Sequence, residues 1–169
     1  SDVIYDMNSR SDVPGYGYQL AKGATALTES WAALPNVSNN HFMLGHLMEW
    51  FYSGLAGIRQ QERGIAFDKI EIRPEVVGDV HHAKGTYDSP YGLISSSWKK
   101  DNHRFELAKQ FPPNTQARVY LPEEEGATVY ENGKLINDAD GKIVAKEQGY
   151  TIVEIGSGDY QFKVVMNDE

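Results

Sequence analysis

The sequence contains no cysteine, which excludes disulfide bonds, cysteine-ligated zinc and thiol nucleophiles at once. It is also short of basic residues, since 16 lysines and arginines face 24 aspartates and glutamates and the net charge is -8. Phosphate binding requires basic patches, and none is visible, so we expect no nucleic-acid partner. No apolar run approaches the ~20 residues of a membrane span, so we expect no membrane partner either.

The sequence also lacks internal repeats and low-complexity segments. Its 169 residues suffice for one ordinary domain, or for a small domain with elements attached. A hydrophobic share of 40% and an aromatic share of 11% are enough for a core and exclude a wholly disordered chain. The compartment stays open, because periplasmic proteins often lack cysteine and a chain that begins inside its parent would have lost any signal peptide.

The segment before Gly64 has a helical pattern. Apolar residues recur at helical spacing between residues 41 and 59, namely at Met43, Leu47, Phe51, Leu55 and Ile58. Residues 1–10 are interpreted as the tail of a further helix. Glycines 45, 54 and 57 each cost helix propensity, by up to ~1 kcal/mol relative to alanine, which predicts close approach of neighbouring helices.

The segment after Gly64 has a strand pattern. Short alternating runs bounded by turn residues occur at 69–73, 91–99, 104–109, 117–121, 128–131, 151–155 and 160–165. Asn132-Gly133 predicts a tight turn, and the last two runs are interpreted as a closing hairpin. Antiparallel strands at this spacing favour a β-sandwich, which we place at residues 65–169.

Glu29 is the first candidate for chemistry. It lies between small, apolar and aromatic neighbours, with Trp31 two residues later and Asn40 and His41 a loop away. A carboxylate handles protons, an aromatic ring packs against a pyranose, and the amide and imidazole hydrogen-bond hydroxyls. From residue types alone, a lone glutamate beside a tryptophan is more often a surface residue, and His41 is equally an exposed or capping residue at a helix start.

Two other groups of residues are interpreted as structural. His81 and His82 are a candidate metal pair, but adjacent strand residues point to opposite faces and cannot easily hold one ion. The acidic run 123–125 is interpreted as a solvated turn rather than a calcium site. The sequence therefore predicts no metal and no cofactor.

Several motifs follow one another along nearly the whole chain. The first three comprise Gly23, Ala24, Thr25, Leu27, Glu29 and Trp31, then Ser38, Asn40 and His41, then Gly45, Glu49 and Trp50. The later ones are residues 72–74, 83–85 and 87–92, Trp98, and residues 112–115. In content and order they resemble the C-terminal end of bacterial α-L-rhamnosidases, glycoside hydrolases with an (α/α)6 barrel followed by a β-sandwich.

This resemblance implies a fold and a mechanism. Residues 1–64 would be the last helices of the barrel, and residues 65–169 the sandwich. Glu29 would be the general base that activates water, His41 would contact the sugar ring, and Trp31 would line the pocket with Asn40 beside it. Family members invert the anomeric centre, with the two carboxyl groups roughly 6.5–9.5 Å apart. The general acid lies upstream in the family, so the isolated chain is expected to be inactive.

The sequence departs from the family pattern next to the candidate base. Thr28 stands where the family usually has tryptophan, Ala26 replaces a threonine, and Met48 replaces a glycine. Losing an indole removes an apolar wall, which would widen the pocket or change the sugar preference. An inactive homologue, or a member acting on another deoxy-sugar, remains an alternative.

The expected partners are a rhamnose-containing glycan and the missing N-terminal part of the barrel. Without that part, an apolar helical face would stay uncovered and cause self-association. A rival interpretation is a non-catalytic carbohydrate-binding sandwich, with Trp98, Tyr87 and Tyr91 as candidate aromatics. A third is a structural domain that binds nothing.

Overall fold

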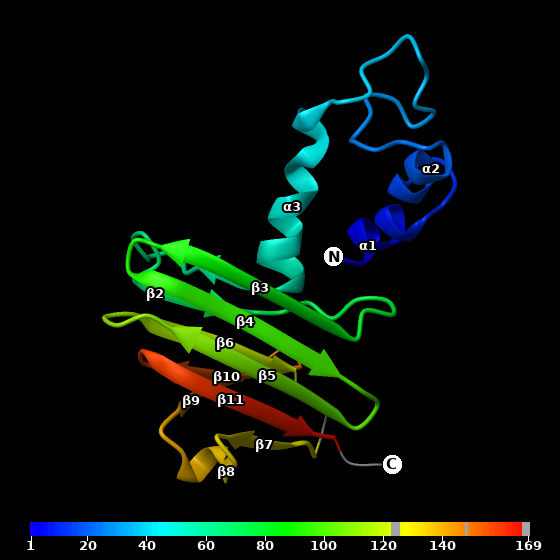
Figure 1. Ribbon diagram of the computed structural model, residues 1–169. Coiled ribbons are helices and arrows are strands. Elements are labelled where there is room, and N and C mark those ends of the chain that lie inside the picture. The colour runs from blue at the N-terminus through cyan, green and yellow to red at the C-terminus, as the bar shows by residue number, and fades with distance from the viewer. Residues whose placement is uncertain (123–125, 148, 167–169) are drawn as a thin grey trace. The chain divides into compact units, whose positions relative to one another are not determined.

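The computed structural model describes residues 1–122, 126–147 and 149–166 (Figure 1). The acidic run 123–125 lies outside these residues. The chain divides into two compact units, one of Ser1–Trp50 with Val77–Asp79 and the other of Phe51–Val76 with Val80–Glu169. The domain boundary at residue 64 stays a prediction.

The first unit contains short helices. These are α1 (Asp2–Ser9), α2 (Tyr16–Ala21), the 3₁₀ turn η1 (Phe42–His46) and α3 (Leu47–Trp50). The helix predicted for residues 1–10 is thereby confirmed. The Tyr5 hydroxyl donates to Asp79 Oδ1 (2.6 Å), and the Trp50 indole donates to Ser1 Oγ (2.7 Å). No helix of the described residues is long and apolar enough to cross a membrane.

The helix predicted for residues 41–59 ends earlier than its apolar pattern indicates. After η1 and α3 comes a π-helical turn, η2 (Phe51–Leu55), and Ile58 already belongs to strand β1 (Ile58–Gln60). Gly57 has a φ of +70°, and a Cβ there would overlap the backbone of Pro74. Gly57 thus ends the helical segment rather than lying within it. Ile58 extended the helical pattern only because it is an apolar core residue of the sheet.

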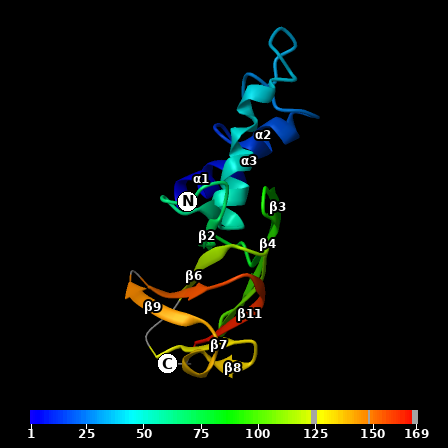
Figure 2. The same cartoon turned by 90° about the vertical axis from the view of Figure 1, so that its left-hand side faces the viewer.

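The second unit is a sandwich of two sheets, which Figure 2 shows as separate layers. One sheet has the order β1-β2-β6-β10-β9 and the other the order β3-β4-β5-β11-β7-β8 among the described residues. The strands after β1 are β2 (Lys69–Ile72), β3 (His82–Ser89), β4 (Gly92–Lys100), β5 (Arg104–Phe111), β6 (Gln116–Pro122), β7 (Thr128–Glu131), β8 (Lys134–Leu135), β9 (Lys142–Glu147), β10 (Tyr150–Ile155) and β11 (Gly158–Val165). β2 and β6 pair in parallel, and the other described pairs are antiparallel.

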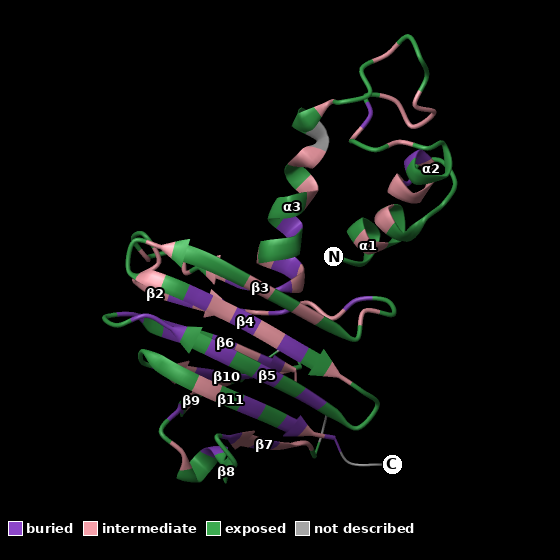
Figure 3. Cartoon of the chain, viewed as in Figure 1, coloured by how far each residue is buried: buried purple, intermediate pink, exposed green. Residues whose placement is uncertain are grey.

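The core lies between the two sheets. Burial alternates along β5 and β6, which appear as banded strands in Figure 3. Side chains of both inner faces are fully buried, among them Ile70, Ile72, Val119, Leu121, Ile94, Trp98, Phe105, Leu107, Phe162 and Val164. The period of two places every second side chain in this layer, so the fold class inferred from the alternating runs is confirmed.

Of two turns predicted in the sandwich, one is confirmed and one is wrong. Asn132 and Gly133 have φ values of +48° and +82° and close the β7–β8 hairpin, as predicted. The closing hairpin predicted for residues 151–165 is wrong, because β10 pairs with β6 and β9 whereas β11 pairs with β5 and β7. Residues 156–157 instead lead from one sheet to the other. A hairpin turn and a link between sheets both consist of turn residues, so composition could not distinguish them.

Side chains of the sandwich cap the end of the π-helical turn. The Trp98 indole donates to the Leu55 carbonyl (2.6 Å), and Ser96 Oγ donates to the Ala56 carbonyl. Lys109 Nζ in turn donates to Ser96 Oγ (2.7 Å). Helix-end carbonyls lack an intrahelical partner, so these donors satisfy them inside the protein. Trp98 is buried and occupied by this contact, which excludes it as an exposed sugar-stacking residue.

Candidate active site

The loop between α2 and η1 carries Glu29, Trp31, Asn40 and His41, and it folds back on itself. The Glu29 amide donates to the Ser38 carbonyl (2.8 Å), and the His41 amide donates to the Leu27 carbonyl (2.7 Å). These two bonds place the segment 27–29 against the segment 38–41. The structure therefore brings the backbone of the candidate base beside that of Asn40 and His41.

The Glu29 carboxylate is exposed and is held by one backbone bond. Its Oε2 accepts a hydrogen bond from the Ser38 amide (3.1 Å). Within the described ranges, Oε1 makes no hydrogen bond, so it is available to a water molecule or a substrate. A carboxylate that accepts a fixed N–H bond through one oxygen and presents the other suits a general base, because geometry comes before pKa in such a role.

The residue before Glu29 anchors the loop from inside. Thr28 is buried, and its amide and carbonyl pair with the side chain of Gln19, which is buried as well (3.4 Å for both bonds). The Thr28 hydroxyl donates to the Ser30 carbonyl. The side chain that replaces the family's tryptophan is thus used to hold the backbone immediately before the carboxylate. Nothing in the sequence singled out Gln19, since a lone helical glutamine carries no pattern.

The other candidate residues differ in their surroundings. Trp31 is half-buried and packs edge-on against Tyr16, with ring centroids 5.4 Å apart and an interplanar angle of 81°. Asn40 is exposed, and His41 is half-buried at the start of η1. Tyr16 was not singled out from the sequence, although an aromatic near a second aromatic could have suggested it. The structure therefore gives Trp31 a fixed ring orientation and leaves Asn40 open to solvent.

Metal ligation has no support in the part of the chain that the structure describes. No group of three or more histidine, cysteine, aspartate or glutamate side chains could hold an ion there. His82 begins β3 and His81 precedes it, and both are exposed.

Comparison with known proteins places these features in a family. The family model of the bacterial α-L-rhamnosidase 6 hairpin glycosidase domain matches residues 1–55, which include the whole loop with Glu29. The model of the bacterial α-L-rhamnosidase C-terminal domain matches residues 57–135. The chain belongs to the bacterial α-L-rhamnosidases. Its order of a hairpin-domain segment followed by a β-sandwich is therefore that of the C-terminal region of this family.

Individual relatives agree with this assignment. An α-L-rhamnosidase of Streptomyces avermitilis is 31% identical over 173 residues. The solved α-L-rhamnosidase from Dictyoglumus thermophilum has a TM-score of 0.87 at 30% identity and covers 97% of this chain and 19% of its own. The Streptomyces avermitilis α-L-rhamnosidase solved in complex with L-rhamnose has a TM-score of 0.83 at 30% identity, covering 96% and 16%.

The match is nearly complete for this chain and small for its relatives. The alignment with the Streptomyces avermitilis protein spans 97% of this chain and 16% of that protein. The relative from Formosa agariphila, 26% identical, is covered over 18% of its length. This rhamnosidase-family chain thus spans less than a fifth of the length of the curated relatives it matches.

Proposed function

We propose that the chain is the C-terminal part of an inverting glycoside hydrolase that removes terminal α-L-rhamnose. Glu29 takes a proton from water, which attacks the anomeric carbon while the glycosidic bond breaks. A carboxylic acid elsewhere in the parent chain gives its proton to the leaving oxygen. His41, Asn40 and Trp31 position the sugar, and no metal or organic cofactor takes part. The observation that carries this proposal is the exposed Glu29 carboxylate, bonded to the Ser38 amide within a segment that matches the hairpin glycosidase domain.

The test uses the parent chain extended upstream, with an aryl α-L-rhamnoside as substrate. Glu29→Gln keeps the size and the contact with Ser38 but cannot accept the proton, so kcat is expected to fall about 10²-fold or more. Glu62→Gln is the matched control, because Glu62 is equally exposed but follows β1. An unaffected Glu29→Gln enzyme would make Glu29 structural, and loss in both variants would point to a general charge effect.

Inversion is tested separately from the identity of the base. Proton NMR of the first product molecules from the extended parent should show β-rhamnose before mutarotation. First-formed α-rhamnose would contradict the inverting mechanism without bearing on Glu29 as a proton acceptor.

The isolated 169-residue chain is proposed to be inactive, because the general acid is not among its residues. Measurable turnover by the purified chain, abolished by Glu29→Gln, would overturn this part of the proposal. Turnover that survives Glu29→Gln would indicate a contaminating enzyme.

Self-association is the second consequence of the same proposal. Large apolar side chains of the helical unit are exposed, with Phe42 at 84% and Met43 at 68%. An uncovered apolar face of this kind is a contact surface for another part of the parent or for a second copy. Light scattering after size exclusion should show oligomers that Phe42→Ser and Met43→Ser reduce. A monodisperse wild-type monomer at high concentration would contradict the proposal.

A carbohydrate-binding sandwich based on the three aromatics named above has weaker support. Trp98 is buried beneath its own sheet, and Tyr87 packs against Phe67 with ring centroids 4.5 Å apart. Tyr91 lies at the turn between β3 and β4, where its amide donates to Ser89 Oγ. These residues do not form a common stacking surface.

A further inference from the structure

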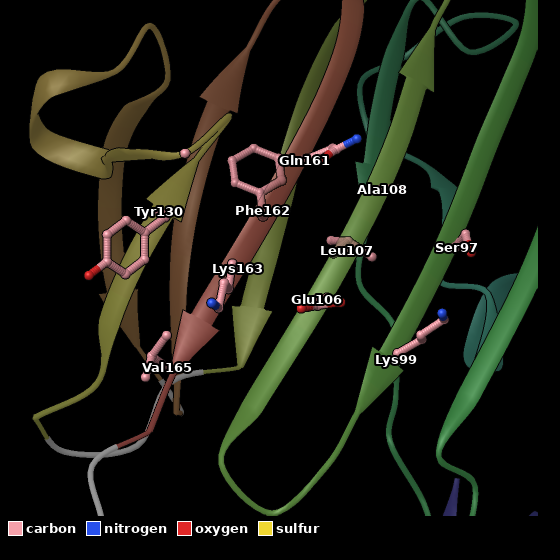
Figure 4. Close-up of a pocket in the computed structure, with 11 residues that line it drawn as sticks. Ser97, Lys99, Glu106, Leu107, Ala108, Tyr130, Gln161, Phe162, Lys163 and Val165 are labelled. Atoms are coloured by element: carbon pink, nitrogen blue, oxygen red, sulfur yellow. The ribbon is translucent and has the colours of Figure 1, made fainter.

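The outer face of the six-stranded sheet carries residues in rows that cross the strands. One row follows the pairing of His82 with Lys99, Lys99 with Glu106, Glu106 with Lys163 and Lys163 with Tyr130. Figure 4 shows Lys99, Glu106, Lys163 and Tyr130 following one another across neighbouring strands. Long side chains in register on five strands form a continuous ridge.

The next row has its shortest side chains at its centre. Here Ser97 pairs with Ala108, with Lys84 on β3 beyond Ser97 and Gln161 on β11 beyond Ala108. A third row, in which Ser95 pairs with Gln110 and Gln110 with Asp159, follows on the far side. Since serine and alanine are short, the surface is lowest over Ser97 and Ala108, and we call this middle row the trough.

Hollows in the surface follow this trough. One of ≈ 660 Å³ lies between Ser97, Ala108 and the ridge with Tyr130, and a second of ≈ 360 Å³ adjoins it. The two share Ser97, Ala108 and Gln161 as lining residues. From Lys84 on β3 to Asn132 beyond β7, the trough crosses four strand spacings of about 4.8 Å, or roughly 19 Å. This length accommodates several linked sugar rings.

The polar groups of the trough suit hydroxyls rather than a single ion. Lys99 and Lys163 flank Glu106, so charges of both signs alternate along one wall. In the described part of the chain, the side chains of Lys99, Lys163 and Gln161 make no hydrogen bond or ion pair. Each sugar hydroxyl both donates and accepts, and it therefore matches a wall of alternating donors and acceptors.

Tyr130 adds an aromatic surface at one end. It is half-buried on β7, opposite Lys163 and next to the β7–β8 turn. A partly exposed aromatic ring can pack against the apolar face of a pyranose. We propose that this trough binds an oligosaccharide segment of the glycan, apart from the sugar that reacts near Glu29.

The test measures binding to the 169-residue chain by isothermal titration calorimetry, with a trisaccharide bearing terminal α-L-rhamnose as the probe. Tyr130→Ala removes the platform, and Ala108→Phe fills the floor from an exposed position, which leaves the core unchanged. Each is expected to weaken binding at least about tenfold. Tyr91→Ala is the matched control, because it removes an exposed tyrosine of the same sandwich outside the trough.

Glu29→Gln separates this proposal from the proposed function. Trisaccharide binding that is unchanged in Glu29→Gln and weakened by Tyr130→Ala supports the trough, whatever the fate of Glu29 as a base. Absence of wild-type binding at millimolar trisaccharide overturns the proposal, as does binding that both trough variants retain. Oligomers abolished by Ala108→Phe, without trisaccharide binding, would overturn it by making the face a protein interface.

Discussion

The helical unit and the sandwich differ in how much of their apolar surface they cover. Helix α1 buries none of its residues, and Phe42 and Met43 are exposed. In the sandwich, β5 buries every second side chain completely or nearly so. The sandwich thus contains its own core, whereas the helical unit leaves large apolar side chains exposed.

The strongest test of this difference is to produce each unit as a separate chain. A chain of residues 51–169 is expected to keep a cooperative thermal transition, because the sandwich core and the caps on Leu55 and Ala56 remain intact. A chain of residues 1–50 is expected to be largely unfolded, because short helices without a core are unstable in water. Circular dichroism during heating measures both.

The full 169-residue chain serves as the control for both pieces. Loss of the transition in residues 51–169 would show that the helices stabilise the sandwich. A folded monomeric piece of residues 1–50 would show that the helical unit is stable although its large apolar side chains are exposed.

Single substitutions should show the same difference between the two units in the free energy of unfolding, with smaller effects. Phe105→Ala in the sandwich core is expected to lower the free energy of unfolding by about 3–5 kcal/mol, since it leaves a cavity under Trp98. Phe42→Ala in the helical unit should change it by less than about 0.5 kcal/mol. Urea unfolding of both variants measures the difference. Equal effects would mean that Phe42 packs in solution.

The same contrast explains what the sequence could predict. Alternation in β5 and β6 reports directly on burial, because the period of a strand is two and one face is dry. Ile58 was wrongly assigned to the helix, because an apolar residue fits a helical as well as a strand pattern. The positive φ of Gly57, which ends the helical segment, is not visible in the sequence. The partners of β10 and β11 could not be predicted, since strand pairing depends on contacts distant in the sequence.

The candidate site was predictable only in part. Glu29 and His41 were found by their motifs, whereas the bond of Glu29 with Ser38 and the pairing of Thr28 with Gln19 depend on how the loop folds back. Hydrogen bonds between backbone and side chains across nine residues leave no periodic signal. The roles of Glu29 and His41 stay proposals.

Lys109 is one of the buried ionisable residues of the sandwich. It is buried on β5, donates to Ser96 Oγ, and burial lowers the pKa of its amine well below the ordinary value. Below the unfolded pKa of about 10.4, the unfolded chain therefore binds more protons than the folded one. Stability should rise with pH from the lowered folded pKa up to about 10.4.

Lys109→Met removes this penalty and keeps the length of the side chain. The free energy of unfolding at neutral pH should rise, because the cost of burying the amine is removed, less what the lost hydrogen bond to Ser96 contributes. The rise with pH that Lys109 causes should disappear as well. Urea unfolding between pH 6 and 10 measures this. Lys142→Met, an exposed lysine of β9, is the control that should keep the wild-type slope. A variant with an unchanged slope and lower stability would show that the lysine is charged and satisfied.

The smallest expected effect comes from the outer face of the other sheet. Arg118 and Glu154 pair across β6 and β10, with Arg118 Nε 2.7 Å from Glu154 Oε1, and this hydrogen bond raises the pKa of the guanidinium. Both side chains are nearly half exposed, so solvent screens the attraction. A double-mutant cycle with Arg118→Ala and Glu154→Ala is expected to give a coupling below about 1 kcal/mol that decreases with salt. A larger, salt-independent coupling would mean that the sandwich depends on its surface as well as its core. Pairs of charged side chains on the outer strands would then be a second source of stability for the sandwich, in addition to its core. The helical unit would lack both, because its short helices provide neither a core nor paired strands.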